Sequence, residues 1–316
     1  MDEKQIRSYL RRQMGKTGWA LLIYYGILNV AVIGVLIIDL LAELLRGGEI
    51  TESVFQSSLL GNAWGYILAS LIGVLLILVW KKKKFFFVEM WQTEKPMTAG
   101  NFFVLLLLFI SVQGAFQVLA WVMESVLNLF GFSVLNAITA ASGTGDTFSM
   151  FLYVGLVAPV MEEIVFRGVL LRMLQPYGKR LAILATAYFF GMFHGNPVQS
   201  PYAFGAGLIL GYVAIEYSIG WAMVLHMFNN LILGDTFTRV ADFFPTSAAE
   251  SVFSMIIWGS VVASVIILIC NRHAISQYRQ ADRIHPWCTK AFFGAPGVIV
   301  FTVLMAMSML AGITQI

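Results

Sequence analysis

The sequence predicts an all-α integral membrane protein. It is expected to be a polytopic bundle of about nine transmembrane helices, with eight as the alternative count. Of its 316 residues, 59% are apolar and only 12% are charged, about half the charged fraction of an ordinary soluble domain. The mean hydropathy is +0.80, and most of the apolar stretches approach the length of about 20 residues that crosses a bilayer. This composition excludes a disordered chain, a coiled coil and a nucleic-acid-binding tail.

Nine apolar stretches, each bounded by charged or turn residues, are expected to form the spans: 18–41, 59–80, 102–124, 148–172, 181–195, 201–217, 219–234, 250–270 and 292–314. The fifth, sixth and seventh are short, closely spaced and rich in glycine, for example at Gly205, Gly207 and Gly211. Small residues let helix backbones approach closely in a membrane. We therefore expect these three helices to lie inside the bundle rather than against lipid.

The distribution of lysine and arginine predicts that the N-terminus lies in the cytoplasm. With that orientation, only Arg46 and Arg239 fall in outer segments and Arg167 falls within a span, while all the other basic residues lie on the inner side. This bias satisfies the positive-inside rule. The basic N-terminal segment is therefore interpreted as a topology determinant beside anionic lipid, and no nucleic-acid partner is expected.

Ionisable side chains inside the membrane are costly, and they mark functional sites by default. Asp39 lies near the outer end of the first span, where it can reach interfacial water. The others are concentrated in the fourth, fifth and seventh spans, with two polar companions: Glu162, Glu163, Arg167, His194, His226, Asn229 and Asn230. This concentration predicts one functional region rather than scattered polar packing.

The fourth span carries two adjacent glutamates that are expected to have different roles. Successive helical residues point about 100° apart, so Glu162 and Glu163 cannot face the same way. Glu163 and Arg167 are four residues apart in the favourable order for an ion pair, which is the ordinary structural reading of such a pair. Glu162 is left without a local partner. An unpaired buried carboxylate can serve as a general base or acid, or as a metal ligand.

The histidines of the fifth and seventh spans are expected near the depth of Glu162. At about 1.5 Å per residue, Glu162 lies roughly 15 Å, His194 roughly 20 Å and His226 roughly 10 Å from the inner boundary. His226 and Asn230 are four residues apart and share one helix face. Each of these residues alone could be an ordinary interhelical hydrogen bonder, whereas the four together at similar depth predict a single site.

Several chemistries could use such a site. A carboxylate and a histidine can take a proton from water, and a second histidine with an asparagine amide can stabilise an oxyanion. Two histidines and one glutamate could also bind zinc, although the His-Glu-x-x-His motif is absent. A proton-coupled transporter also places ionisable groups at the midplane. However, the polar spans occur in one region without a second copy, which disfavours a transporter.

Three motifs in order on successive spans resemble the CPBP intramembrane protease family, the type II CAAX prenyl endopeptidase group that includes the Ras-converting enzyme and bacterial Abi proteins. Glu162, Glu163 and Arg167 fit Glu-Glu-x-x-x-Arg, Phe190 and His194 fit Phe-x-x-x-His, and His226 and Asn230 fit His-x-x-x-Asn. The resemblance covers roughly residues 150–235. It implies an all-α membrane core with a cavity between helices, and hydrolysis of a peptide bond.

The resemblance also implies roles for individual residues. Glu162 would activate water with His194, while His226 and Asn230 would form the oxyanion hole. Glu163 and Arg167 would support Glu162 structurally. The chain is then organised as N-terminal helices with an outer loop (1–147), catalytic helices (148–235) and C-terminal helices (236–316) within one membrane domain.

The expected substrate is a membrane-associated peptide or protein, and the expected location is the cell membrane of a bacterium. A non-catalytic immunity or scaffold protein that keeps the family fold is the alternative. A divalent metal such as zinc, with Glu162, His194 and His226 as ligands, stays open. We favour a metal-free mechanism, since zinc-bound imidazoles need second acceptors and Glu163 is already expected to pair with Arg167.

Overall fold

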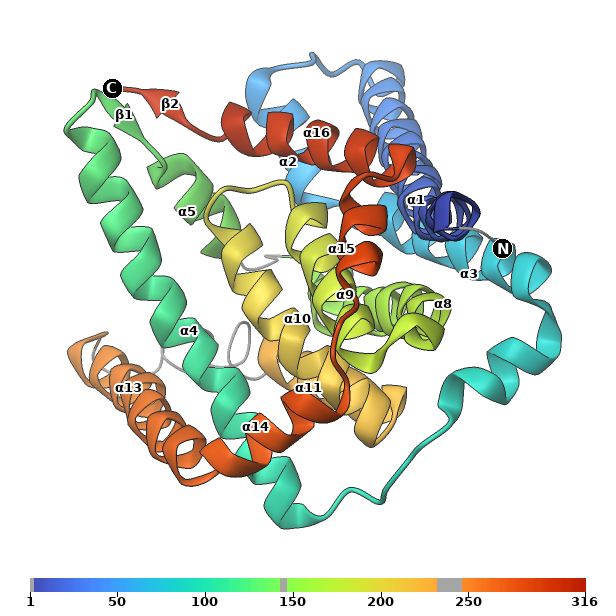
Figure 1. Cartoon of the computed structure of the whole chain (residues 1–316). Helices are drawn as coiled ribbons and strands as arrows, with labels where there is room; N and C mark the ends of the chain where they lie inside the picture. Colours follow the sequence, from blue (N-terminus) through green and yellow to red (C-terminus); the bar gives the residue numbers. More distant parts are fainter. Residues whose placement is uncertain (1–2, 143–146, 232–245) are drawn as a thin grey trace.

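The computed structural model describes residues 3–142, 147–231 and 246–316, and nearly all of them are helical (Figure 1). The N-terminal third consists of three long helices and two short ones: α1 (Glu3–Leu45), α2 (Glu52–Gly61), α3 (Trp64–Phe87), the 3-10 helix η1 (Glu89–Trp91) and α4 (Ala99–Asn128). Threonine caps start two of them, because Thr51 accepts a hydrogen bond from the Val54 N–H and Thr98 accepts one from the Asn101 N–H.

The fourth predicted span is helical throughout but is interrupted twice by π-helical turns. After α5 (Leu135–Ser142), its segments are α6 (Phe148–Leu152), the π-helix η2 (Tyr153–Val157), α7 (Ala158–Glu163), the π-helix η3 (Ile164–Leu170), α8 (Leu171–Leu174) and the 3-10 helix η4 (Gln175–Tyr177). π-Helical turns are rare and occur frequently at functional sites. Here they flank the short helix α7, which carries both glutamates.

The next three helices form the centre of the bundle: α9 (Lys179–Phe193), α10 (Gln199–Glu216) and α11 (Ile219–Phe228). Glycines bring α9 and α10 together, as predicted. A Cβ atom added to Gly207 would lie only 3.0 Å from the Ala187 Cα, and one added to Gly191 would lie 2.8 Å from the Ser200 carbonyl oxygen. Larger side chains at these positions would therefore push the two helices apart.

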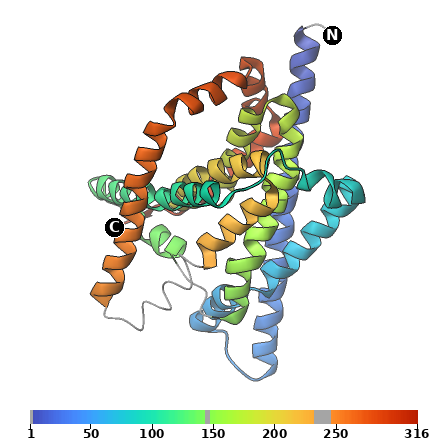
Figure 2. The ribbon, with the colours of Figure 1, turned by 90° about the horizontal axis from the view of Figure 1, so that it is seen from below.

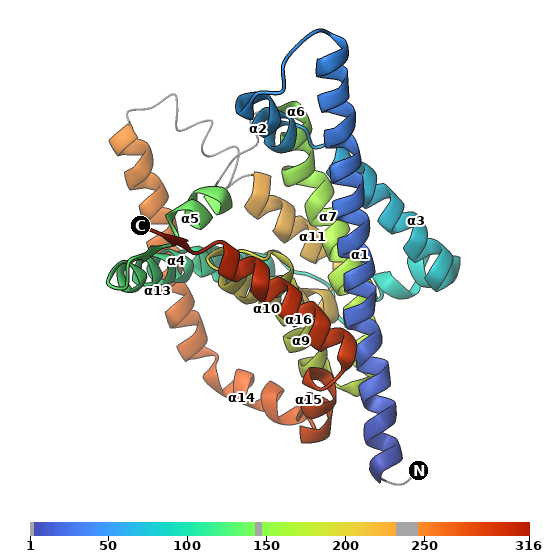
Figure 3. The ribbon, with the colours of Figure 1, turned by 90° about the horizontal axis from the view of Figure 1, so that it is seen from above.

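The C-terminal part surrounds this centre with α13 (Thr246–Cys270), α14 (Arg272–Ala281), α15 (Pro286–Phe293) and α16 (Pro296–Ala311). The chain ends in β2 (Thr314–Gln315), which pairs antiparallel with β1 (Phe132–Ser133). α1 runs along one side of the molecule and α13 lies on the opposite side (Figures 2 and 3). α16 packs on α1 where Gly18 meets the backbone of Gly297.

Burial separates the inner helices from the outer ones. Fully buried aromatic side chains such as Phe166, Phe189 and Phe301 lie at the centre. By contrast, α1, α3 and α13 expose large apolar side chains, for example Val30, Val79 and Met255. An apolar outer surface of this extent is unusual for a soluble protein and suits contact with lipid. The predicted all-α, membrane-type bundle is therefore confirmed.

The number of spans stays a prediction. Within the described residues, four segments are long and apolar enough to cross a membrane: Glu3–Leu45, Glu52–Lys81, Ala99–Asn128 and Ala248–Cys270. The pair α15 and α16, bent by 59°, adds a fifth if it is counted as one span. The predicted spans at 148–172 and 181–195 are an interrupted helix and a helix of 15 residues. The end of the predicted span 219–234 and Arg239 lie outside the described residues.

Candidate active site

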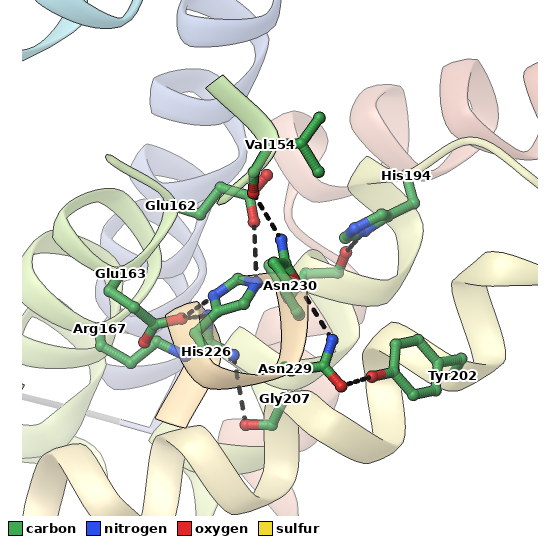
Figure 4. A network of polar contacts seen from close by, with 11 residues as sticks. Val154, Glu162, Glu163, Arg167, His194, Tyr202, Gly207, His226, Asn229 and Asn230 are labelled. Carbon is green, nitrogen blue, oxygen red and sulfur yellow. Dashed lines mark hydrogen bonds and ion pairs between the residues drawn. The ribbon is translucent and has the colours of Figure 1, made fainter. Parts of the chain in front are cut away.

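The four predicted catalytic residues line one cavity of about 210 Å³. Glu162 comes from α7, His194 from the C-terminal end of α9 and His226 from α11. Asn230 lies in the π-helical turn that continues α11 to Leu231. Three helices that are separate in the sequence thus bring a carboxylate, two imidazoles and an amide to one place (Figure 4).

Local sequence features fix where these side chains lie. Ser218 caps α11 by accepting a hydrogen bond from the Trp221 N–H, so His226 falls two turns into the helix. Gly195 has a φ of 57°, in the left-handed region that favours glycine. It ends α9 directly after His194, which is therefore the C-cap residue of that helix.

Glu163 and Arg167 form the predicted ion pair in the interior. The Arg167 Nη1 donates to the Glu163 Oε1 at 2.8 Å, and both side chains are 0% exposed. The same Oε1 lies 3.0 Å from the Nδ1 of His226. Glu163 therefore binds a candidate catalytic histidine as well as Arg167. The expectation that Arg167 would be the only partner of Glu163 was wrong, because it was based on contacts within one helix, and His226 comes from another.

Phe190 lies at the centre of these groups. The Arg167 Cζ is 4.3 Å from the centroid of its ring, a cation–π distance. The rings of His194 and His226 meet Phe190 edge-on, with centroid distances of 4.9 and 5.7 Å. The first residue of the Phe-x-x-x-His pattern thus separates the buried cation from the cavity and orients both imidazoles.

Hydrogen bonds indicate that the Nδ1 carries a proton in both histidines. The His194 Nδ1 lies 2.8 Å from the Phe190 carbonyl oxygen, which can only accept, so this Nδ1 carries the proton. The His226 Nδ1 faces the Glu163 carboxylate and carries a proton for the same reason. In each ring the Nε2 is then the unprotonated nitrogen and is available as a base or a ligand.

His226, rather than His194, lies beside Glu162. Its Nε2 is 3.7 Å from the Glu162 Oε2, and no other histidine comes within 4.0 Å of that carboxylate in the described part of the chain. Glu162 keeps 18% of its side chain exposed, whereas Glu163 keeps none. Two acceptors cannot hydrogen-bond each other directly, but at this separation they suit a water that donates to both.

The side-chain amides of Asn229 and Asn230 bring hydrogen-bond donors to the same cavity. The Asn230 Nδ2 donates to the Val154 carbonyl at 2.9 Å, which identifies it as the nitrogen of the amide. The Asn229 Nδ2 donates to the Asn230 Oδ1 at 3.0 Å. Each NH₂ group retains a second N–H. The cavity lining therefore combines acceptors, from Glu162 and the His226 Nε2, with the amide donors of the two asparagines.

Two further residues hold these asparagines, and the sequence did not reveal them. The Tyr202 hydroxyl donates to the Asn229 Oδ1 at 2.9 Å. The Gln113 Nε2 lies within hydrogen-bonding distance of both the Tyr202 hydroxyl and the Asn229 Oδ1, at 3.2 and 3.3 Å. Gln113 is a polar residue in the long apolar helix α4, which is the one sequence signal that pointed to it.

The donor types suit a metal ion, but their spacing does not. Both histidines donate the Nδ1–H to an oxygen and leave the Nε2 free to bind a metal, which is the usual arrangement of zinc-bound imidazoles. In the ranges that the structure describes, however, no three His, Cys, Asp or Glu side chains are gathered closely enough to hold a metal ion. Glu162, His194 and His226 therefore do not form a zinc site in this arrangement.

The comparison with known families falls on the same helices. Residues 144–232 match the Rce1-like family model, described as type II CAAX prenyl endopeptidase Rce1-like. This match confirms the predicted resemblance over the segment that contains all three motifs. It supports a CAAX-type intramembrane protease at the level of the family, and with the apolar helices it supports an integral membrane location. No curated protein and no solved structure matches the chain significantly.

Proposed function

We propose that the protein is an intramembrane endopeptidase that hydrolyses a peptide bond in a membrane-associated peptide or protein. The observation that carries this proposal is the polarity of the cavity. The Glu162 carboxylate and the His226 Nε2, 3.7 Å apart, share the cavity lining with the side-chain amides of Asn229 and Asn230, which supply N–H donors. Hydrolysis of an amide needs a base for water on one side of the carbonyl group and donors for the oxyanion on the other.

The proposed reaction begins with a water that donates hydrogen bonds to Glu162 and to the His226 Nε2. Glu162 takes one proton as the water oxygen bonds to the scissile carbonyl carbon. The carbonyl oxygen becomes an oxyanion and accepts a hydrogen bond from the free N–H of Asn230. Glu162 then returns the proton to the amide nitrogen and the C–N bond breaks, which gives a carboxylic acid and an amine. The acid proton passes to the amine, and a carboxylate and an ammonium group leave.

The remaining polar groups would position these reacting atoms. Glu163 holds the His226 Nδ1–H, which directs the basic Nε2 toward the water. Arg167 compensates the charge of Glu163. His194 presents a second basic nitrogen on the far side of the cavity (Figure 4). Its expected share in activating water with Glu162 stays a prediction.

The proposal includes a location and an orientation. The protein would reside in the cell membrane of a bacterium, with its N-terminus in the cytoplasm, as the lysine and arginine distribution predicts. Glu162, His194, His226 and Asn230 line a cavity between helices inside the bundle. The substrate would therefore be a chain that already lies in or on the membrane.

The decisive experiment compares purified wild-type protein with Glu162→Gln in liposomes, using a membrane-peptide library and mass spectrometry of the fragments. Loss of the general base should lower the cleavage rate about 10²–10⁴-fold. Asp39→Asn is the matched control. Asp39 is also an acid within a predicted span, but it accepts a hydrogen bond from Asn62 instead of lining the cavity. This control should cleave at the wild-type rate.

The same pair of variants separates an enzyme from a scaffold. If wild type and Glu162→Gln yield identical fragments, the endopeptidase proposal fails. If Glu162→Gln also keeps the cellular function of the protein, the family fold serves as a non-catalytic immunity or scaffold protein.

A further inference from the structure

A second, much larger hollow lies on the outside of the bundle. It is an open groove of about 680 Å³ between α1 and α3, with its floor formed by Val165, Val169 and Leu170 of η3. α3 touches α1 closely at its N-terminal half, where Gly65 meets the Val32 backbone. The two helices then diverge toward the C-terminal end of α3 (Figure 3). Nearly all of the lining is apolar: Trp19, Ala20, Ile23, Tyr24, Ile27, Leu76, Ile77, Val79 and Trp80.

The length of the groove corresponds to one leaflet of a membrane. Along α1 it extends from Lys16 to Ile27, and these two residues lie about 16 Å apart along the helix axis at 1.5 Å per residue. Half of a hydrocarbon core of about 30 Å is about 15 Å. Trp19 and Trp80 line the end near Lys16, and tryptophan favours the boundary between hydrocarbon and headgroups.

The same end of the groove holds two cations without acidic partners. Lys16 lines the groove, and its ammonium group donates to the Gln13 Oε1 at 2.8 Å. The Lys81 Nζ lies 4.2 Å from the Trp80 ring centroid and 5.5 Å from that of Phe85. Over the described residues, no carboxylate lies within 4.0 Å of either ammonium, whereas the nearby Lys84 pairs with Glu89 at 3.6 Å.

We propose that this groove binds one anionic phospholipid, with its acyl chains between α1, α3 and η3 and its phosphate between Lys16 and Lys81. The apolar walls match the chains in length and chemistry, and the two unpaired cations match the charge of the headgroup. A neutral zwitterionic lipid would fill the walls equally well but would leave less net attraction for the lysines. The proposal does not depend on the proposed catalytic activity.

The bound lipid would pack against a wall that is shared with the active site. Tyr24 lines the groove and stacks on Phe193 with a centroid distance of 5.6 Å. Phe193 directly precedes His194 and packs on Phe166 at 5.5 Å. Lipid in the groove therefore supports the aromatic layer behind His194.

Native mass spectrometry of the full chain in detergent, titrated with phosphatidylglycerol or phosphatidylcholine, tests the proposal. Wild type should retain one phosphatidylglycerol in preference to phosphatidylcholine. The double variant Lys16→Gln/Lys81→Gln should bind phosphatidylglycerol about 30-fold more weakly, as expected for two lost lysine contacts to an anionic lipid. Lys81 lies against the lining residue Trp80, whereas Lys83→Gln/Lys84→Gln removes the same charge from exposed positions further along α3 and should bind like wild type.

A steric pair of variants tests the position of the acyl chains. Leu76→Trp fills the groove and should reduce the binding of both lipids, while Leu75→Trp changes an exposed neighbour outside the groove and should not. Equal binding of the two lipids by wild type, or equal losses in the two lysine double variants, would overturn the proposal. So would a second copy of the chain that is displaced by Leu76→Trp, because the groove would then be an interface.

Discussion

Neutralising Glu163 while Arg167 stays in place is expected to destabilise the protein by about 3–5 kcal/mol, the usual effect of breaking a buried ion pair from one side. Both side chains are 0% exposed and are joined at 2.8 Å. In Glu163→Gln the guanidinium keeps its charge but loses its counter-charge. Its remaining contacts include the Phe190 ring at 4.3 Å, the Phe166 ring at 5.8 Å and the Gly207 carbonyl oxygen at 3.5 Å.

These neighbours do not replace the carboxylate. A desolvated cation–π contact contributes about 2 kcal/mol, and it is already present in the wild type. The 3.5 Å contact to Gly207 is at the limit of a hydrogen bond. Bulk water does not reach the guanidinium either, because the Arg167 side chain is 0% exposed. The cost of the uncompensated charge should therefore appear as lost stability.

A double-mutant cycle measures the pair directly. Glu163→Gln, Arg167→Met and the double variant would be unfolded in lipid–detergent bicelles and followed by tryptophan fluorescence. Removing both charges should recover a large part of the loss, because no buried charge is then unpaired. Glu94→Gln is the matched control, since Glu94 pairs with Lys179 at 2.6 Å with side chains 49% and 32% exposed. It should cost about 0–1 kcal/mol.

Two results would refute this reasoning. Losses that add up in the double variant would show that the two charges do not compensate each other. If Glu163→Gln were as stable as the Glu94 control and lost activity as completely as Glu162→Gln, the roles of the two glutamates would be interchanged.

Two further predictions concern the cavity. Tyr202→Phe removes the hydroxyl that donates to Asn229. It should lower kcat about 10-fold with little change in KM, as expected for one misplaced donor group in the transition state. In the control Tyr188→Phe, the lost hydroxyl bonds Thr302 instead, and kcat should be unchanged. A chelator should not change the activity of purified protein if water is held by the side chains alone. Stoichiometric zinc, with activity lost to the chelator and restored by zinc, would instead make Glu162, His194 and His226 its ligands.

Helical periodicity was sufficient to predict the contacts within one element. The spacing of Glu163 and Arg167 placed them on one face, and the structure contains their ion pair. The estimated depths placed Glu162, His194 and His226 near one level, and the three residues line a single cavity. Both arguments use only the rise and rotation of a helix, so they need no knowledge of which helices are neighbours.

Contacts between elements could not be derived in this way. The rotation of α11 about its own axis decides that His226 meets both glutamates, and no sequence spacing fixes that rotation. Gln113 reaches the site from α4, a helix far away in the sequence. The π-helical turns beside α7 were likewise not foreseen, because one additional residue in a helical turn leaves no clear trace in a hydropathy pattern.

The environment explains how two adjacent glutamates of identical chemistry can differ in function. Glu163 points into the interior, where one oxygen accepts from both Arg167 and His226, while Glu162 points into the cavity and keeps part of its surface exposed. The shared oxygen makes these residues one electrostatic unit. Arg167 pairs with the Glu163 carboxylate, Glu163 binds the His226 Nδ1–H, and the Nε2 of the same ring faces Glu162. Changes at Glu163 should therefore alter stability and the basicity of the water-binding pair together, whereas changes at Glu162 should alter catalysis alone.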